Sequence, residues 1–267
     1  MRNAGWMLLA ALLVAGCASS KTADDKKTLQ AGYDALSAQD YDGAMARSSE
    51  FIANNPNGGA GTPDALYLQG RVYEHRAETA DAAGRAAEAR SDLQDARGTY
   101  EHALTLNPSS KIIPLLQAGV ANAAYFQEDY FTAMRNWAAA YPGLTQPDAK
   151  AWVKYRLGLC QQRLGRFDEA DRSFAEVQQQ FPHTAPAERA SVHQGAKAFY
   201  VALGSWADAK SADAIVTTLR GQGFSALKAT QPTGREAVRV GPAYNYDQAK
   251  ALRARLLSAY PAATIEP

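Results

Sequence analysis

One pattern occurs twice near the end of this 267-residue chain, as Val201-Ala202-Leu203-Gly204-Ser205-Trp206 and, thirty-seven residues later, as Val238-Arg239-Val240-Gly241-Pro242-Ala243. Each copy alternates apolar residues and ends in Gly, which is typical of a half-buried strand. Each leads into a helical pattern, over residues 212–219 and 249–256. A second short strand closes each copy, at residues 224–228 and 263–265. This order, strand-helix-strand twice, predicts a four-stranded sheet with two helices on one face.

The alternation also assigns side chains to the two faces of this sheet. Four apolar residues share a parity and should face the helices: Val201, Leu203, Val238 and Val240. The residues between them should lie on the open face: Tyr200, Ala202, Ala237 and Arg239. The open face would then carry an aromatic ring and a guanidinium group, which suit a ligand rich in hydroxyl groups.

Length and composition indicate a globular protein of two domains. Apolar residues make up 46% of the chain and charged residues 21%, so a disordered chain is excluded. Lys and Arg number 28 against 27 Asp and Glu. This balance gives no basic field for phosphate neutralisation, so we expect no nucleic-acid partner.

The first sixteen residues have the pattern of a signal peptide. Arg2 precedes an apolar run over residues 6–15, which is shorter than the roughly 20 residues that span a bilayer. The run ends in Leu13-Val14-Ala15-Gly16-Cys17, which resembles the lipobox of bacterial lipoproteins. That resemblance implies that Cys17 is lipidated and becomes the new N-terminus. The alternative is an ordinary secretory signal with a chance Cys.

The residues after Cys17 extend this interpretation. Residues 17–27 are small and polar, and we expect a lipidated Cys and a tether there. The residue after Cys17 is Ala18. By resemblance to lipoproteins of cells with two membranes, an Asp at this position would indicate retention at the inner membrane. In a cell with two membranes, we therefore expect the protein on the outer one, facing the periplasm. If Cys17 carries lipid, Cys160 is the one remaining thiol and no internal disulfide can form.

Residues 28–197 have the pattern of a helical repeat array. The best copy, residues 151–182, resembles the 34-residue tetratricopeptide repeat (TPR) at Leu157, Gly158, Leu164, Gly165, Phe167, Ala170, Phe174 and Pro182. Weaker copies flank it, and one of them carries an insertion of about fourteen residues around residues 77–90. Because fourteen residues are two heptads, the insertion predicts two helices that are each about two turns longer. Such a hairpin could contact a partner or could simply be solvated.

The end of the array predicts a stiff connection to the last domain. Residues 186–197 form a half repeat that we expect to cap the solenoid. No Gly/Ser/Pro linker separates it from the strand that begins near Phe199, so a fairly fixed angle between the two domains is expected.

Residues 198–267 resemble the SPOR (sporulation-related repeat) family. The resemblance rests on the stretch from Tyr200 to Trp206, on Gly223-Phe224 and on the stretch from Val238 to Pro242. It implies a βαββαβ fold of the ferredoxin/RNP type with a four-stranded antiparallel sheet, so the fold class is an all-α TPR solenoid followed by this small domain. It also implies binding of peptidoglycan, in particular of glycan strands without stem peptides, which are enriched at division septa.

The same resemblance suggests which residues bind the glycan. We expect these to be Tyr200, Ala202, Gly204, Ser205, Trp206, Arg239 and Tyr244. Two positions depart from the family pattern: Ala202 replaces a Gln, and Ala243 replaces a Phe for which Tyr244 could substitute. The alternative is a SPOR-like fold that is kept for architecture and has little affinity for glycan.

The chain has no recognisable catalytic pattern. The four histidines show no paired metal-ligand spacing, and there is no Gly-rich phosphate loop and no Gly-x-Ser-x-Gly elbow. Cys160 stands where the repeat has a small packed residue. We therefore expect no enzyme, no cofactor and no metal.

The hypothesis that follows is a non-enzymatic scaffold of the cell envelope. Cys17 would hold it in the membrane, residues 198–267 would bind peptidoglycan, and the solenoid would bind a protein partner that the sequence does not identify. An alternative keeps this fold but assigns the function to the solenoid, as in TPR lipoproteins of outer-membrane protein assembly.

Overall fold

The computed structural model describes the backbone of residues 5–267 and the side chains from Lys21 onward. The side chains of the expected signal peptide and of Cys17 lie outside the described residues. The chain divides into two units, one ending at Leu144 and the other comprising Thr145–Pro267.

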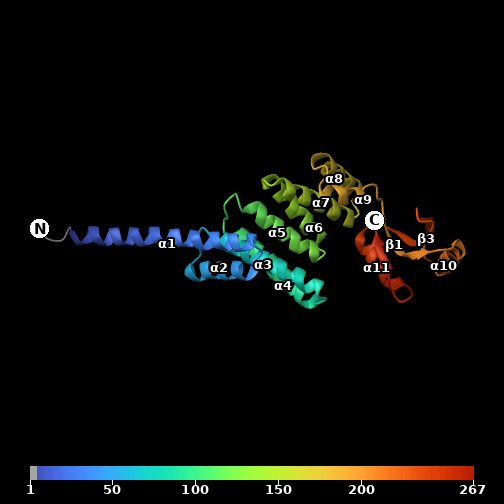
Figure 1. Ribbon diagram of the computed structural model, residues 1–267, viewed down its shortest axis with the longest axis horizontal. Helices are drawn as coiled ribbons and strands as arrows, with labels where there is room; N and C mark the ends of the chain where they lie inside the picture. Colours follow the sequence, from blue (N-terminus) through green and yellow to red (C-terminus); the bar gives the residue numbers. More distant parts are fainter. Residues whose placement is uncertain (1–4) are drawn as a thin grey trace. The chain divides into compact units, whose positions relative to one another are not determined.

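The first unit is entirely helical in its described part. Its elements are α1 (Gly5–Ser37), α2 (Tyr41–Asn54), α3 (Thr62–Ala82), α4 (Ala86–Thr105), α5 (Ile113–Phe126), α6 (Tyr130–Ala140) and the 3-10 helix η1 (Tyr141–Gly143). Consecutive helices pack side by side, as Figure 1 shows for α2 to α4. This is the stacking expected of helical repeats, in which each hairpin buries its apolar face against the next.

Helix α1 differs from the sequence-based expectation. It runs without a break through residues 17–27, where we expected a tether. A helix rises about 1.5 Å per residue, so this segment spans about 16 Å rather than the roughly 35 Å of an extended chain. Among helices with described side chains, none is long and apolar enough to cross a membrane.

The predicted insertion does lengthen one helical hairpin. Helices α3 and α4 have 21 and 20 residues, whereas α2 and α5 have 14 each. Gly84 lies in the turn between α3 and α4 with a φ of 72°, a conformation that glycine adopts without strain. The extra turns continue both helices in phase, as the insertion of two heptads predicted.

Glycines on one helix make room for aromatic rings on a neighbouring helix of the array. Tyr100 of α4 is fully buried, and a Cβ placed on Gly119 of α5 would lie 2.5 Å from its Cε2. In the repeat that the sequence shows best, a Cβ on Gly158 would lie 2.5 Å from Cε1 of Phe174. Larger side chains at these glycines would push the helices apart, so the Gly-aromatic pairs set the helix spacing.

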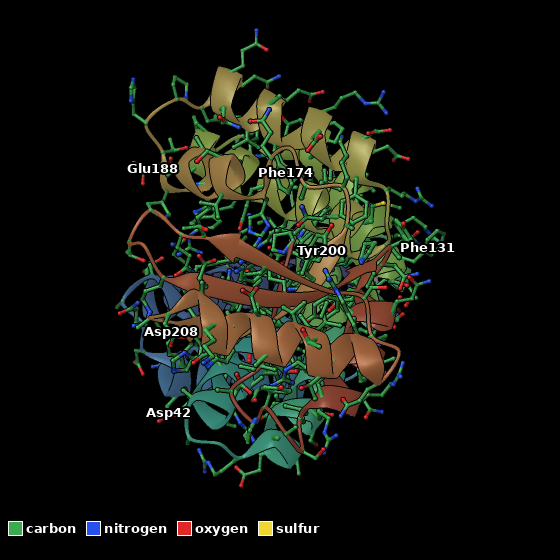
Figure 2. All side chains as sticks on the ribbon, turned by 90° about the vertical axis from the view of Figure 1, so that its right-hand side faces the viewer. Asp42, Phe131, Phe174, Glu188, Tyr200 and Asp208 are labelled. Atoms are coloured by element: carbon green, nitrogen blue, oxygen red, sulfur yellow. The ribbon has the colours of Figure 1, made fainter. Side chains whose placement is uncertain are left out.

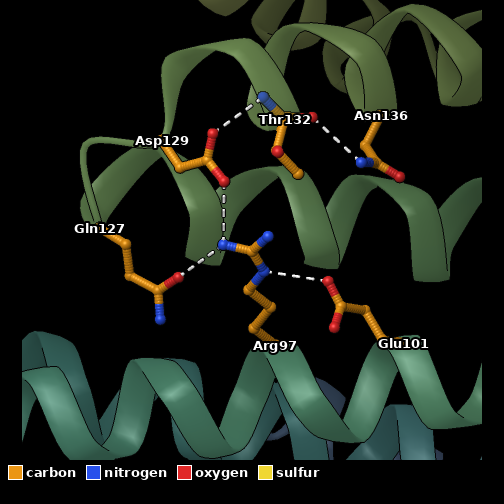
Figure 3. Close-up of polar contacts among 6 residues, drawn as sticks. All are labelled: Arg97, Glu101, Gln127, Asp129, Thr132 and Asn136. Atoms are coloured by element: carbon orange, nitrogen blue, oxygen red, sulfur yellow. Dashed lines mark hydrogen bonds and ion pairs between the residues drawn. The ribbon is translucent and has the colours of Figure 1, made fainter.

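A polar clamp joins α4 to the turn between α5 and α6 (Figure 3). Arg97 donates from Nε to Glu101 at 2.9 Å and from Nη1 to Gln127 at 3.0 Å and Asp129 at 3.1 Å. Asp129 also caps α6 by accepting from the Thr132 amide at 3.1 Å. Burial opposes ionisation of Asp129, but the hydrogen bonds from Thr132 and Arg97 outweigh it and lower its pKa. One carboxylate thus both starts α6 and ties it to the preceding hairpin.

The second unit combines the last helices of the array with a sheet. Its elements are α7 (Pro147–Arg163), α8 (Phe167–Gln180), α9 (Ala185–His193), β1 (Phe199–Trp206), α10 (Ala209–Gly221), β2 (Ala226–Thr230), β3 (Glu236–Ala243), α11 (Tyr246–Leu256) and β4 (Thr264–Glu266). The strand order is β2-β3-β1-β4 and every pair is antiparallel. The predicted βαββαβ domain with a four-stranded antiparallel sheet is confirmed.

The core of this domain lies between the sheet and its two helices. The four residues expected to face the helices, Val201, Leu203, Val238 and Val240, are all buried. They form one cluster with apolar residues of α10 and α11: Ala212, Val216, Leu219 and Leu256. The face of each of these four strand residues was therefore predicted correctly.

Both glycines of the repeated pattern adopt backbone conformations that disfavour other residues. Gly204 has a φ of 135° and Gly241 a φ of 153°. A Cβ on Gly241 would also lie 3.0 Å from the Phe199 carbonyl oxygen and 2.8 Å from Cδ1 of Tyr200. Pairing of β1 with β3 shifts register between Phe199 and Val201 and again between Ala202 and Gly204. Glycine is thus required where β1 bends against β3.

The last repeat and the sheet domain share a small hydrophobic cluster. Phe167 at the start of α8 lies 5.6 Å from the Phe199 ring of β1, and Phe199 lies 5.7 Å from Tyr246 of α11. The Arg163 guanidinium stands 3.4 Å above the Tyr246 ring. Within this unit, the direct connection seen in the sequence corresponds to a packed junction.

We predict that Gly241→Ala destabilises the second unit by about 2–4 kcal/mol, because it adds backbone strain and a clash with Phe199 and Tyr200. Urea unfolding followed by circular dichroism would measure the loss. Gly221→Ala is the matched control, since no heavy atom lies within 4 Å of a Cβ built there. Equal stability of the two variants would contradict this account of the motif glycines.

Candidate functional site

The open face of the sheet carries a hollow of about 170 Å³. Its lining comes from three strands and two neighbouring loops: Ala202, Gly204, Ser205, Gln231, Ala237, Arg239, Ala262, Thr264 and Glu266. Because β1 lies between β3 and β4 in the sheet, the hollow is centred on β1. It brings together the polar side chains of Ser205, Gln231, Arg239, Thr264 and Glu266.

Arg239 and Glu266 form the charged part of this lining. An Nη nitrogen of Arg239 on β3 lies 3.0 Å from a carboxylate oxygen of Glu266 on β4, and about two fifths of each side chain is exposed. An ion pair this exposed contributes at most about 1 kcal/mol. The Nε of Arg239 is buried and has no hydrogen-bond partner among the described residues. Because this nitrogen is buried, a ligand at the hollow can reach only the exposed part of the Arg239 guanidinium.

A second arginine, Arg235, fixes the end of β1. Its Nε donates to the Ser205 hydroxyl at 3.0 Å, and its Nη2 donates to the Ser205 carbonyl oxygen at 2.6 Å. The Ser205 side chain lines the hollow but already accepts from Arg235. Ser205 can still donate its own hydroxyl hydrogen to a ligand.

The structure brings together four of the seven residues expected to bind glycan. Ala202, Gly204, Ser205 and Arg239 all line the hollow. Tyr200 pairs with Glu266 across β1 and β4 and lies on the side of the sheet away from α10, as Figure 2 shows, but outside the lining of the hollow.

The other two expected residues lie elsewhere. Trp206 packs against the hydrophobic cluster on the helical side, so it faces away from the hollow. The register shift between Ala202 and Gly204 inserts one extra residue into β1, which reverses the alternation beyond that point. Tyr244 follows β3, and 63% of its surface is exposed. It lies outside the lining of the hollow, and its expected role in glycan binding stays a prediction.

Residues of the hollow that sequence reasoning missed come mainly from the end of the chain. Thr264, Glu266 and the neighbouring Ala262 lie on or beside β4, a strand of only three residues. Gln231 lies in the turn between β2 and β3. Alternation within β4 could have placed Thr264 and Glu266 on one face, but its pairing beside β1 was needed to bring Glu266 to Arg239.

The described residues provide no sign of a catalytic or metal centre. Among them, no group of three or more His, Cys, Asp or Glu side chains could hold a metal ion. Burial raises the pKa of the Cys160 thiol to about 12, although Arg163 and Arg156 act in the opposite direction. Burial, helped by Arg163, lowers the pKa of His193, whose Nδ1 lies 3.0 Å from the Gln162 side-chain oxygen. Cys160 is buried in the last repeat, and the contact of His193 with Gln162 joins α9 to α7 there.

Comparison with protein families matches each part of this architecture. A model of the SPOR domain matches residues 195–265, and a model of the tetratricopeptide repeat matches residues 153–184. A SPOR domain implies peptidoglycan binding and a place in the cell envelope, and tetratricopeptide repeats suggest protein interactions. Both kinds of domain are typically non-catalytic, and no catalytic family matches.

The solved structures similar to this chain include those of two proteins, YrrB and MamA. YrrB, described as a TPR protein with an unusual peptide-binding site, has a TM-score of 0.48 at 18% identity, covering 66% of this chain and 79% of its own. The MamA protein has a TM-score of 0.44 at 16% identity, covering 65% of this chain and 84% of its own. Comparison with curated proteins gives no match.

We predict that Trp206→Ala lowers the free energy of unfolding by about 2 kcal/mol, because a large, partly buried ring leaves the cluster under the sheet. Binding of the folded protein to peptidoglycan should not change. Thermal unfolding and co-sedimentation with cell-wall sacculi would measure the two effects. Lost binding at unchanged stability would instead place Trp206 in the binding site.

Proposed function

We propose that this chain is a lipid-anchored, non-enzymatic scaffold of the cell envelope that binds peptidoglycan glycan strands without stem peptides. The binding surface is the open face of the sheet. The observation that carries the proposal is the hollow on this face, lined by the partly exposed Arg239 side chain, within the segment matched as a SPOR domain.

The chemistry of this face suits a sugar polymer. Glycan strands present hydroxyl, ether and amide groups, which need hydrogen-bond donors and acceptors on an accessible surface. Arg239, Glu266, Thr264 and Ser205 provide both kinds of group around one hollow. Tyr200 adds an aromatic ring on the same face, beside Glu266. A strand without stem peptides can lie closer to this face, because peptides would project against the rim.

The other parts of the chain are consistent with the proposed scaffold function. The helical repeats of each unit present helix surfaces to a protein partner, and Cys17 provides the membrane anchor. Several acyl chains on one Cys hold a protein firmly, whereas a single chain binds only marginally. Because stripped strands are enriched at division septa, as the SPOR resemblance implies, the proposed location is the septal envelope.

We predict that the full chain, purified in detergent, co-sediments with sacculi and that binding rises after an amidase removes the stem peptides. Arg239→Ala should weaken this binding about tenfold, because a charged donor is lost from the hollow. Lys210→Ala is the control, since it removes an exposed cation from the helical side of the same domain. Binding that ignores both peptide removal and Arg239→Ala would refute the proposal and leave the solenoid as the functional part.

We predict that a fluorescent fusion of the full chain fractionates with membranes and concentrates at division sites. Cys17→Ser should release it into the soluble fraction, because the acyl chains can no longer be attached. Cys160→Ala should leave it membrane-bound, since Cys160 is buried in the last repeat. Membrane retention of the Cys17→Ser variant would contradict the anchor, and an even distribution around the cell would contradict the septal location.

A further inference from the structure

The floor of the hollow consists of small residues. The small residues of the lining are Ala202 of β1, Ala237 of β3, Gly204 and Ala262, and the charged ones are Arg239 and Glu266. Ala237 is 95% buried yet lines the hollow, as expected of a floor residue. Ala202 pairs directly with Arg239 on one side and with Thr264 on the other, so its methyl group lies at the centre. A longer side chain at residue 202 would fill the space.

The size of the hollow limits what it can hold. Its volume of about 170 Å³ is close to the roughly 150 Å³ of a cavity that admits benzene. One substituent or one ring of a ligand therefore fits, whereas a disaccharide does not. A glycan strand would have to lie across the face and place a single group into the hollow.

The charges of the lining favour a neutral group. The one cation of the lining, Arg239, is already paired with its one anion, Glu266, at 3.0 Å. An incoming carboxylate would have to compete with Glu266 for the same guanidinium. A neutral carbonyl oxygen can instead accept from an N–H of the partly exposed Arg239 guanidinium that the ion pair does not use, and leave the ion pair intact.

We propose that this hollow is a subsite for an acetamido group of an N-acetylated amino sugar, and that Ala202 is the residue that opens it. The methyl end of the group packs on Ala202, Ala237 and Ala262, and its carbonyl oxygen accepts from the exposed part of the Arg239 guanidinium. The inference rests on the proposed glycan binding, and it names the group of the sugar that the hollow recognises. It also reverses the interpretation of Ala202 as a loss of affinity, because the small side chain creates the subsite.

Wild-type protein provides the first test, which does not depend on the folding of any variant. Full chain in detergent is titrated with amidase-stripped sacculi, with the same sacculi after chemical de-N-acetylation, and with de-N-acetylated sacculi that have been re-acetylated. The expected result is at least tenfold weaker binding without acetyl groups, fully restored by re-acetylation. Equal binding to all three would overturn the subsite.

Substitution at residue 202 provides the second test. The change in binding has opposite signs if Ala202 opens a subsite and if Ala202 merely lacks a hydrogen-bonding group. Ala202→Gln fills the hollow and should weaken binding to stripped sacculi about tenfold. If Ala202 merely lacks a useful hydrogen-bonding group, Ala202→Gln should strengthen binding, which would overturn the subsite. Ala214→Gln is the matched control, because Ala214 is exposed on α10, on the helical side of the sheet. Its binding should equal that of the wild type.

The two levels of proposal fail in different ways. Absence of wild-type binding to stripped, acetylated sacculi would refute the proposed function and this subsite with it. Binding that is strong but insensitive to acetylation and to Ala202→Gln would refute the subsite and leave glycan binding by the open face in place. Circular dichroism of each variant would show that the sheet is intact when binding is compared.

Discussion

The packing of β1 and β3 against α10 and α11 determines what the sheet domain can present to a ligand. Val201, Val238 and Val240 are almost completely buried in the cluster beneath the sheet. Since successive side chains of a strand point to opposite faces, burying these residues places Ala202 and Arg239 on the open face. A shift of register by one residue would put the valines in water, and their burial prevents it.

The bulge in β1 is the exception to this alternation, and it shapes the site. One extra residue between Ala202 and Gly204 returns Trp206 to the helical side and places Ser205 on the open face beside Ala237. Glycine at residue 204 tolerates the φ of 135° that accompanies the bend. The result is a floor of small residues with polar groups at its edge instead of a flat aromatic surface.

In the repeat array, glycines likewise allow close packing, here between neighbouring helices. Glycine on one helix and an aromatic ring on the next set the spacing at Gly119 and Tyr100, and again at Gly158 and Phe174. Polar contacts also join one hairpin to the next. Arg97 of α4, for example, donates to Asp129, the residue that caps α6. In the last repeat this packing continues into the sheet domain through Phe167 and Phe199. The end of the array and the sheet therefore belong to one unit of the chain.

The sequence by itself determined the elements of this protein and the faces of its strands. Periodicity is a local property, so the repeated pattern around Gly204 and Gly241 was enough to predict two βαβ units, and the insertion around residues 77–90 was enough to predict two longer helices. Only the tertiary structure decided which side chains meet. The pairing of β4 with β1 brings Glu266 to Arg239, and the bulge turns Trp206 away from them. Both depend on contacts between residues that lie far apart in the chain, which no local pattern specifies.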